Sequence, residues 1–297
     1  MVKIDDLVTE TRNQRTMNLG EMTALEIAQV MNEEDEKVAQ AIKPIVPQIA
    51  EAITLVANSI QGVGRLIYMG AGTSGRLGVL DAVECVPTFG VSFEKVIGLI
   101  AGGEGAFVRA VEGAEDSETL GVEDLQNINL TAEDVVIGIA ASGRTPYVIA
   151  GLRYARTLGA ATIAVSCNKN SLIGKEADIA LEVEVGPEVL AGSTRLRSGT
   201  AQKMILNMIS TGAMVRIGKV YKNLMVDVQQ TNVKLEERGK NIVMEATGAD
   251  RERVTQSLQA ADNDVKIAIV MILANTTKED AHNRLQRAKG FVAEAIK

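Results

Sequence analysis

Five short runs rich in apolar residues, each ending in a turn, most constrain how this chain can fold. They are Leu66–Met69, Val96–Ile100, Val135–Ala140, Ala161–Val165 and Ile179–Val185. Helical patterns follow several of them, at Gly75–Val83, Ala106–Val111 and Pro146–Thr157. Continuous apolar strands that alternate with helices are typical of a parallel sheet covered by helices on both faces. We therefore predict an α/β layered domain.

Helices are expected on both sides of this region of the chain. Thr23 followed by Glu26 forms a capping box that opens an N-terminal helix. No strand is evident after Gly199; the predicted helices there are Thr200–Val220, Lys222 to about Met244, Arg251–Ala260, Val265–Ala274, Glu279–Ala288 and Phe291–Ile296, with a second capping box at Thr276 and Glu279. We predict two domains, residues 1–246 and a small all-helical domain at 247–297.

The composition excludes several classes of partner. The 38 acidic residues outnumber the 31 basic ones, and no run of Lys and Arg forms a nucleic-acid footprint. The longest stretch without charge, Ala52–Gly64, is shorter than the roughly 20 residues of a membrane span. The N-terminus carries acids where a signal peptide would be apolar, and Cys85 and Cys167 form no paired motif. We expect a reduced, cytoplasmic protein that binds neither nucleic acid nor membrane.

Two strand-to-helix turns carry the same hydroxyl chemistry. The first strand leads into the loop 70–76, GAGTSGR, and the third leads into the loop 141–146, ASGRTP. Thr145 is a good N-cap residue, and Pro146 suits the first position of a helix. Free backbone N–H groups at a helix start, together with hydroxyl groups, form a natural phosphate site. The alternative is that both are tight turns whose hydroxyls only cap helices.

The first loop fits a nucleotide-binding motif less well than it fits a simple phosphate site. Its Gly-x-Gly-x-x-Gly spacing matches the dinucleotide fingerprint, which also needs an acidic residue at the end of the second strand. That strand ends in Ile100-Ala101-Gly102-Gly103, without an acid. A nucleotide P-loop would need Lys and then Ser or Thr where Arg76 and Leu77 stand.

Acid–base chemistry in this chain has to come from carboxylates, Lys or Tyr. The only histidine, His282, lies in the predicted C-terminal helices, and no Gly-x-Ser-x-Gly elbow or metal-ligand cluster is present. Glu84 has apolar neighbours, a setting that favours desolvation, and Glu115 follows the helix after the second strand. Taken singly, either acid would be read as a solvated surface group.

Glu84 lies far along the predicted helix from Ser74, which makes it difficult for both to contact one sugar. Ten helical residues separate it from Ser74, which is about 15 Å and longer than one sugar. Either the helix ends early, or Glu84 faces a site that another subunit completes. We favour the second explanation.

A third polar segment, 186–203, follows the last predicted strand. It contains four hydroxyl side chains and three cations directly before a long helix. A loop this polar at the end of a buried sheet is usually functional or a subunit contact.

At these residues the chain resembles a known family. GAGTSGR and AASGRTPY are similar to the loops of sugar isomerase (SIS) domains, which bind phosphorylated sugars. GPEVLAGSTRLRSGTAQKMILN resembles the signature shared by N-acetylmuramic acid 6-phosphate etherases and the glucokinase regulatory protein. DAVECVPTFG, VEGAEDS and the opening TETRNQRTMNLGEMTALEIAQVMNEED resemble the etherases specifically. The resemblance covers essentially the whole chain; one departure is Arg197, where the family is expected to carry Lys.

The resemblance implies a parallel-sheet SIS domain with flanking helices and a small helical C-terminal domain. It implies a lyase that cleaves the D-lactyl ether of N-acetylmuramic acid 6-phosphate during recycling of bacterial cell-wall sugars, without metal or cofactor. Glu84 is implied as the proton donor and Glu115 as the second acid–base residue. The implied phosphate ligands are Thr73, Ser74, Ser142 and Thr145, with Glu188, Ser193 and Thr194 near the sugar. SIS domains commonly pair near their sites, so a homodimer is expected.

Two other functions share the same phosphosugar site. A sugar-phosphate-sensing regulator would bind the ligand and release no lactate, although the glucokinase regulatory protein is longer and has two SIS domains. An aldose–ketose isomerase would use a carboxylate base at the same site and yield a ketose.

Overall fold

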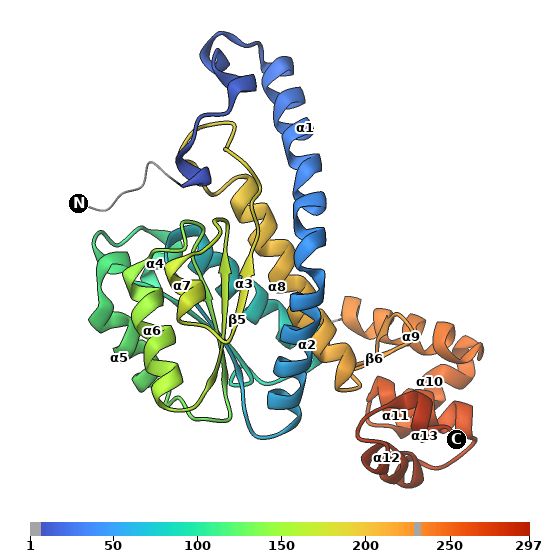
Figure 1. Cartoon of the computed structure of the whole chain (residues 1–297). Helices are drawn as coiled ribbons and strands as arrows, with labels where there is room; N and C mark the ends of the chain where they lie inside the picture. The colour runs from blue at the N-terminus through green and yellow to red at the C-terminus, as the bar shows by residue number, and fades with distance from the viewer. Residues whose placement is uncertain (1–6, 229–232) are drawn as a thin grey trace. The chain divides into compact units, whose positions relative to one another are not determined.

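The computed structural model describes residues 7–228 and 233–297 (Figure 1). The chain divides into two compact units. The first contains Met1–Val83 and Glu94–Ser210, and the second contains Glu84–Phe93 and Thr211–Lys297. The domain division at residues 246 and 247 stays a prediction.

A five-stranded parallel sheet forms the centre of the first unit. Its strands are β1 (Leu66–Gly70), β2 (Val96–Ile100), β3 (Val135–Ile139), β4 (Ala161–Ser166) and β5 (Ile179–Glu182), in the order β2-β1-β3-β4-β5. Every residue of β1 and β3 is buried, as expected for central strands covered on both faces. The predicted α/β class is therefore confirmed, and the last strand ends three residues earlier than predicted.

Helices cover both faces of this sheet (Figure 1). On one face, α5 (Glu118–Asn127) and α6 (Pro146–Thr157) share a buried apolar core with the strands. On the other face lie α2 (Val46–Gln61), α3 (Gly72–Phe89) and α8 (Arg197–Arg216). The short helices α4 (Gly105–Val108) and α7 (Leu172–Lys175) lie in loops at the ends of strands.

A buried carboxylate joins β1, α3 and α8. Asp81 accepts hydrogen bonds from the Tyr68 hydroxyl at 2.7 Å, from Asn207 Nδ2 at 2.6 Å and from Ser210 Oγ at 3.2 Å. The three donors come from one strand and one helix, so this group holds α8 against α3 and the sheet.

The N-terminal helix α1 (Ala24–Ile42) begins as predicted. Thr23 Oγ1 accepts from the Glu26 backbone N–H, and the Glu26 carboxylate accepts from the Thr23 backbone N–H, which confirms the capping box. The buried stripe of α1 contains Val30, Val38 and Ile42 together with one acid, Glu34. A carboxylate in such a stripe requires partners of opposite charge.

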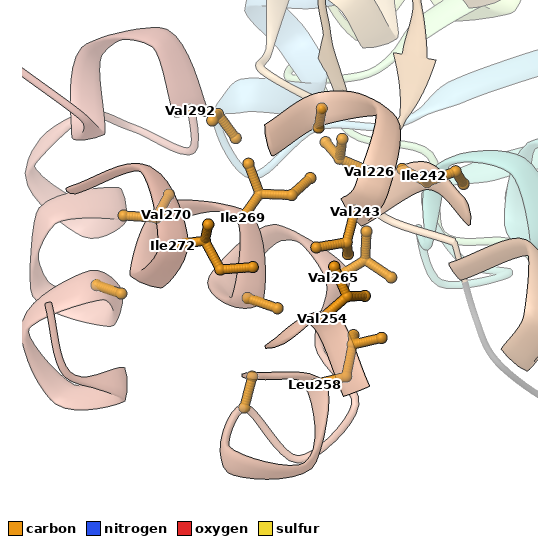
Figure 2. Close-up of a cluster of buried hydrophobic side chains, with 14 of the residues drawn as sticks. Val226, Ile242, Val243, Val254, Leu258, Val265, Ile269, Val270, Ile272 and Val292 are labelled. Carbon is orange, nitrogen blue, oxygen red and sulfur yellow. The ribbon is translucent and has the colours of Figure 1, made fainter. Parts of the chain in front are cut away.

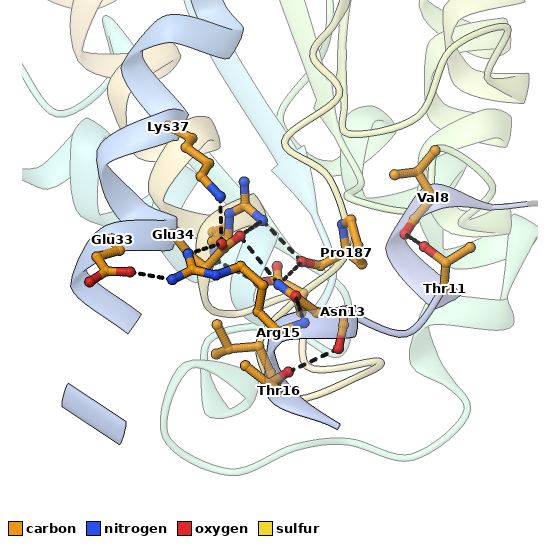
Figure 3. Close-up of polar contacts among 12 residues, drawn as sticks. Val8, Thr11, Asn13, Arg15, Thr16, Glu33, Glu34, Lys37 and Pro187 are labelled. Carbon is orange, nitrogen blue, oxygen red and sulfur yellow. Dashed lines mark hydrogen bonds and ion pairs between the residues drawn. The ribbon is translucent and has the colours of Figure 1, made fainter. Parts of the chain in front are cut away.

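Glu34 is surrounded by cations, as Figure 3 shows. Its carboxylate lies 2.8 Å from Arg15 Nη1, 2.5 Å from Lys37 Nζ and 2.8 Å from Arg197 Nη1. Burial acts to raise the pKa of Glu34, but the hydrogen bonds of Lys37 and Arg15 and the charge of Arg197 outweigh it, so that the pKa lies below its ordinary 4.5. This group ties α1 and the segment before it to the start of α8.

Arg197, at the position where Lys is expected from the resemblance, is one of these cations. Its Nη1 also donates to the Pro187 carbonyl oxygen at 3.0 Å, and its side chain is 5% exposed. One terminal nitrogen of the guanidinium thus bridges two acceptors, the Glu34 carboxylate and the Pro187 carbonyl oxygen. The residue holds Glu34 within the protein.

We predict that Glu34→Gln lowers the free energy of unfolding by about 3 kcal/mol at pH 7, because it leaves Arg197 buried without a counter-charge. A carboxylate with a lowered native pKa stabilises the fold above its unfolded pKa, and that stabilisation is lost as the pH falls through the native pKa. Urea unfolding between pH 7 and pH 3 should therefore show a smaller loss of stability on acidification in Glu34→Gln than in wild type. Parallel pH curves for the two proteins would contradict the pairing.

The second unit corrects part of the sequence-based prediction. A hairpin, β6 (Val220–Tyr221) and β7 (Leu224–Met225), occupies the place where a helix was predicted from Lys222 and no strand was expected. Lys222 has φ +54°, so the chain reverses there, and α9 (Val233–Thr247) begins later. Residues 229–232 of that predicted helix lie outside the described residues.

Short helices complete this unit around their own apolar core. They are α10 (Arg251–Ala260), α11 (Val265–Ala274), α12 (Lys278–Arg287) and α13 (Val292–Ala295). Figure 2 shows side chains from β7–α9 and from α10, α11 and α13 converging, among them Val243, Val254 and Ile269. The capping box predicted at Thr276 and Glu279 is wrong by one residue, because the N-cap is Thr277, whose side chain accepts from the Asp280 N–H. Among the described helices, none is long and apolar enough to cross a membrane.

Candidate active site

The topology of the sheet identifies where a ligand can bind. From β1 the chain crosses to β2 on one side, and from β3 it crosses to β4 on the other side. In open α/β sheets, ligands bind outside the carboxyl ends of the strands at such a switch point. Because β1 and β3 are neighbours in register, with Gly70 opposite Ile139, the two loops predicted to hold phosphate leave the same edge side by side.

Glycines allow the first loop to close tightly. A Cβ at Gly75 would lie 2.5 Å from the Gly70 carbonyl oxygen, and Gly72 has φ +53°. The start of α3 can therefore approach the end of β1 closely, with the backbone N–H groups of its first turn directed outward from the strand. Ser74 is buried in this turn, and Thr73 is half-buried.

The first loop also lies against the third polar segment. Ser74 Oγ donates to Gln202 Oε1 of α8 at 3.0 Å. A Cβ at Gly199 would lie 3.5 Å from Thr73 Cγ2 and 3.6 Å from the Thr194 carbonyl oxygen. Thr73, Ser74 and Thr194 are therefore brought to one place, although they are far apart in sequence.

The second loop has the form of a hydroxyl-lined turn. Gly143 has φ +70°, and a Cβ there would lie 2.4 Å from Ser171 Cβ. Ser142 Oγ accepts from the Arg144 N–H at 3.3 Å. Thr145 is the N-cap of α6, as predicted, but its side chain makes no capping hydrogen bond. Its hydroxyl is thus not used as a helix cap, which weakens the alternative that these hydroxyls serve only to cap.

Glu115 lies in a cavity beside the first loop. It stands on a short 3-10 helix (Ala114–Asp116) and lines a cavity of about 320 Å³ together with Ala71, Gly72 and Arg76. Arg76 joins the first loop to α4 by donating to the carbonyl oxygens of Ala106 and Phe107, both at 2.8 Å. One predicted carboxylate and one predicted phosphate loop therefore share a cavity.

Glu188 has an internal role in the third segment. Its fully buried carboxylate accepts from the backbone N–H groups of Arg197 and Ser198 at 3.0 and 2.9 Å, and from Ser198 Oγ at 2.9 Å. These contacts cap the start of α8. Ser193 lies half-buried in the turn just before this cap. A contact between Glu188 or Ser193 and the sugar stays a prediction.

Glu84 lies on α3, which runs without a break from Gly72 to Phe89. The alternative in which this helix ends early is therefore wrong, and the separation of about 15 Å between Ser74 and Glu84 along the helix stands. Glu84 is exposed in the single chain, so the desolvation expected from its apolar neighbours is not observed. The nearby apolar side chains Leu80 and Val83 are themselves about half exposed.

Two buried amides brace the loops and were missed by the analysis of the sequence. Gln202 contacts Ser74, and Asn168 donates to the Ala141 carbonyl oxygen and to Thr9 Oγ1, both at 3.1 Å. Gln202 stands within the third polar segment, one helical turn after Ser198, and this position is the one signal that could have found it. Asn168 follows β4 and has no sequence pattern of its own.

The described residues contain no group of three or more His, Cys, Asp or Glu side chains placed to hold a metal ion. A thiol nucleophile is also disfavoured near the site. Burial raises the pKa of Cys167 to about 12, and its Sγ contacts the Ser198 carbonyl oxygen at 3.7 Å. The functional groups around the two loops are hydroxyls, backbone N–H groups, the arginines Arg76 and Arg144 and the carboxylates Glu112 and Glu115.

This fold and these loops define a SIS-domain protein. Residues 114–211 match the SIS domain family, and residues 48–156 match the N-terminal SIS domain of the glucokinase regulatory protein. The solved phosphoheptose isomerase of Neisseria gonorrhoeae shares the fold, with a TM-score of 0.51 and 17% identity over 64% of this chain and 98% of that chain.

Full-length relatives define the family more narrowly. N-acetylmuramic acid 6-phosphate etherases of Listeria monocytogenes and of a Geobacillus species are 62% and 61% identical, covering 99% of this chain and 99% of each relative. The etherase of Pectobacterium atrosepticum is 60% identical over 99% of this chain and 97% of its own length. The chain belongs to the N-acetylmuramic acid 6-phosphate etherase family.

Proposed function

We infer that the protein is a carbon–oxygen lyase that converts N-acetylmuramic acid 6-phosphate into N-acetylglucosamine 6-phosphate and D-lactate. This reaction recycles sugars of the bacterial cell wall. The observation that carries the inference is the cavity in which Glu115 lies beside the first hydroxyl loop, between the segments that follow β1 and β2. The full-length identity to etherases supports the choice of substrate, which we place in this cavity.

The chemistry suits the side chains that are present. Opening of the sugar ring exposes an aldehyde at carbon 1, which acidifies the proton on carbon 2. A carboxylate removes that proton, the C3–O bond breaks, and lactate departs with a proton from a second acid. Water then adds across the resulting C2–C3 double bond of the aldehyde, with its hydroxyl at carbon 3 and its proton at carbon 2. Two carboxyl groups can perform these proton transfers.

In this scheme the two loops hold the phosphate and the two glutamates perform the chemistry. Thr73, Ser74, Ser142 and Thr145 bind the phosphate with the N–H groups at the starts of α3 and α6; the free hydroxyl of Thr145 and the adjacent ends of β1 and β3 support this assignment. Glu84 is the proton donor, and Glu115 is the second acid–base residue. Ser193 and Thr194 lie toward the sugar, and Glu188 acts beside them by capping α8 and fixing the segment that carries them.

A homodimer completes the site around Glu84. Arg76, Leu80 and Val83 share one face of α3, and Arg76 contacts α4, where Phe107 and Val108 are also exposed. Exposed apolar side chains on two elements in contact favour an interaction site there. Covering it with a second copy of the chain would remove water from Glu84, which follows Leu80 by one helical turn.

The function is tested by incubating the purified protein with N-acetylmuramic acid 6-phosphate and measuring D-lactate. Release of stoichiometric N-acetylglucosamine 6-phosphate and D-lactate is expected. Binding of the substrate without lactate would identify a sensor, and formation of a ketose would identify an isomerase. Either outcome would contradict the lyase.

Ser74→Ala tests the phosphate site. We expect the Kd for N-acetylglucosamine 6-phosphate to rise about tenfold or more, because a hydrogen bond from a hydroxyl to a charged phosphate is lost. Isothermal titration calorimetry measures this Kd. Ser210→Ala, which removes a buried hydroxyl bound to Asp81 instead, is the matched control and should bind as wild type does. An unchanged Kd in a folded Ser74→Ala protein would contradict the phosphate assignment.

A further inference from the structure

The direction of one hydrogen bond conflicts with the role of Ser74. A serine hydroxyl has a single proton to donate. Here that proton is directed to Gln202 Oε1 at 3.0 Å, so it is not available to a phosphate oxygen, which can only accept. To donate to phosphate, the Ser74 hydroxyl has to give up this bond, and it keeps a hydrogen bond with Gln202 only if the direction of the bond reverses.

Gln202 is in a position to reverse it. Its side chain is 1% exposed, and its Nε2 is one of three buried side-chain nitrogen or oxygen atoms without a hydrogen-bond partner in residues 7–228 and 233–297. Turning the amide over places Nε2 next to Ser74 Oγ, so that an N–H donates to the hydroxyl. Both orientations make one bond to Ser74 and leave the other end of the amide unpartnered, so neither is strongly preferred by the protein alone.

We propose that Gln202 is a positioning residue that sets the direction of the Ser74 hydroxyl. Its amide accepts from Ser74 in the free protein and donates to Ser74 when phosphate is bound, which releases the Ser74 proton to the ligand. A ligand selects between two such states by binding one of them more tightly. The proposal rests on the proposed function, because it assumes that Ser74 binds the 6-phosphate.

Two substitutions separate this role from simple packing. In Gln202→Glu, assayed at about pH 9 so that the buried carboxyl is ionised, the carboxylate can only accept, so it keeps the Ser74 proton and repels phosphate. We expect the Kd for N-acetylglucosamine 6-phosphate, compared with wild type at the same pH, to rise more than thirtyfold. Gln202→Met has a side chain of similar length that neither donates to nor accepts from Ser74, so it imposes no direction on the Ser74 hydroxyl. We expect this variant to raise the Kd for N-acetylglucosamine 6-phosphate about threefold to tenfold. In both variants the KM for the substrate should rise more than kcat falls, as for a lost binding contact remote from the reacting bonds.

A double-mutant cycle with Ser74→Ala gives the decisive comparison. If Gln202 acts through Ser74, Gln202→Met should change the Kd less than twofold in the Ser74→Ala background. An equal effect of Gln202→Met in both backgrounds would overturn the proposal, as would a Kd for Gln202→Glu no higher than that of Gln202→Met. Gln202→Ala gives a second truncation if methionine prevents folding, and Ser210→Ala controls for loss of a buried polar group on α8.

The calorimetry uses the reaction product, so it does not depend on turnover. A wild-type protein that binds N-acetylglucosamine 6-phosphate but releases no D-lactate would contradict the lyase function and leave the test of Gln202 valid. A wild-type protein that releases D-lactate while the cycle is additive would overturn the role of Gln202 and retain the lyase.

Discussion

Glu84→Gln is expected to lower kcat for D-lactate release by about 10³-fold while the protein stays folded. Glutamine has nearly the shape of glutamate but can neither release nor take up a proton, and positioned acid–base catalysis contributes about 10²–10⁴-fold. Because Glu84 is exposed on α3 in the single chain, its replacement should change the melting temperature little. D-lactate release at saturating substrate measures kcat.

Glu94→Gln is the matched control for this experiment. Glu94 is also exposed and lies in the turn between α3 and β2. Its replacement should leave both kcat and KM at the wild-type values. If Glu84→Gln retained kcat within about threefold of wild type, Glu84 would not be the proton donor, and the acid would have to be sought elsewhere.

Mixing two inactive variants is expected to restore about a quarter of wild-type activity. If each site takes Glu84 from one subunit and Glu115 from the other, a dimer of Glu84→Gln with Glu115→Gln contains one intact site and one doubly altered site. Random exchange makes half of the dimers mixed, and one of the two sites in each of these is active. From a residual level near 10⁻³, this is a gain of more than a hundredfold.

The mixing experiment needs subunits that exchange or are produced together. Coexpression with two different affinity tags isolates the mixed dimer, which should then have about half of wild-type activity, and light scattering gives the mass of the assembly. Asp116→Asn, next to Glu115 and exposed, is the matched control. It should be active by itself, so mixing it with Glu84→Gln should give no gain over the activity that its own intact sites supply. No rescue in an isolated mixed dimer would show that both glutamates act within one subunit.

Local sequence patterns predicted the elements on which the first unit is built. Continuous apolar runs place β1 and β3 in the centre of the sheet because only a strand buried on both faces can omit polar residues. The capping box at Thr23 and Glu26 was predictable since both of its hydrogen bonds form within four residues. The hairpin at Val220–Met225 was not predictable in this way, because its short strands carry no periodic pattern and pack on the apolar core of the second unit.

In the candidate site, too, some features follow from local sequence and others depend on the tertiary structure. By itself the sequence determined the two hydroxyl loops, since glycine spacing and hydroxyl type are local properties. Through the family resemblance it also predicted roles for Glu84 and Glu115. Only the tertiary structure decided that the loops leave neighbouring strands, that Glu115 shares a cavity with Gly72, and that the Glu188 carboxylate caps α8. It also decided that Ser74 meets Gln202, 128 residues away. Such contacts depend on the order of strands in the sheet and on the packing of helices across it, and neither is encoded in a short window of residues.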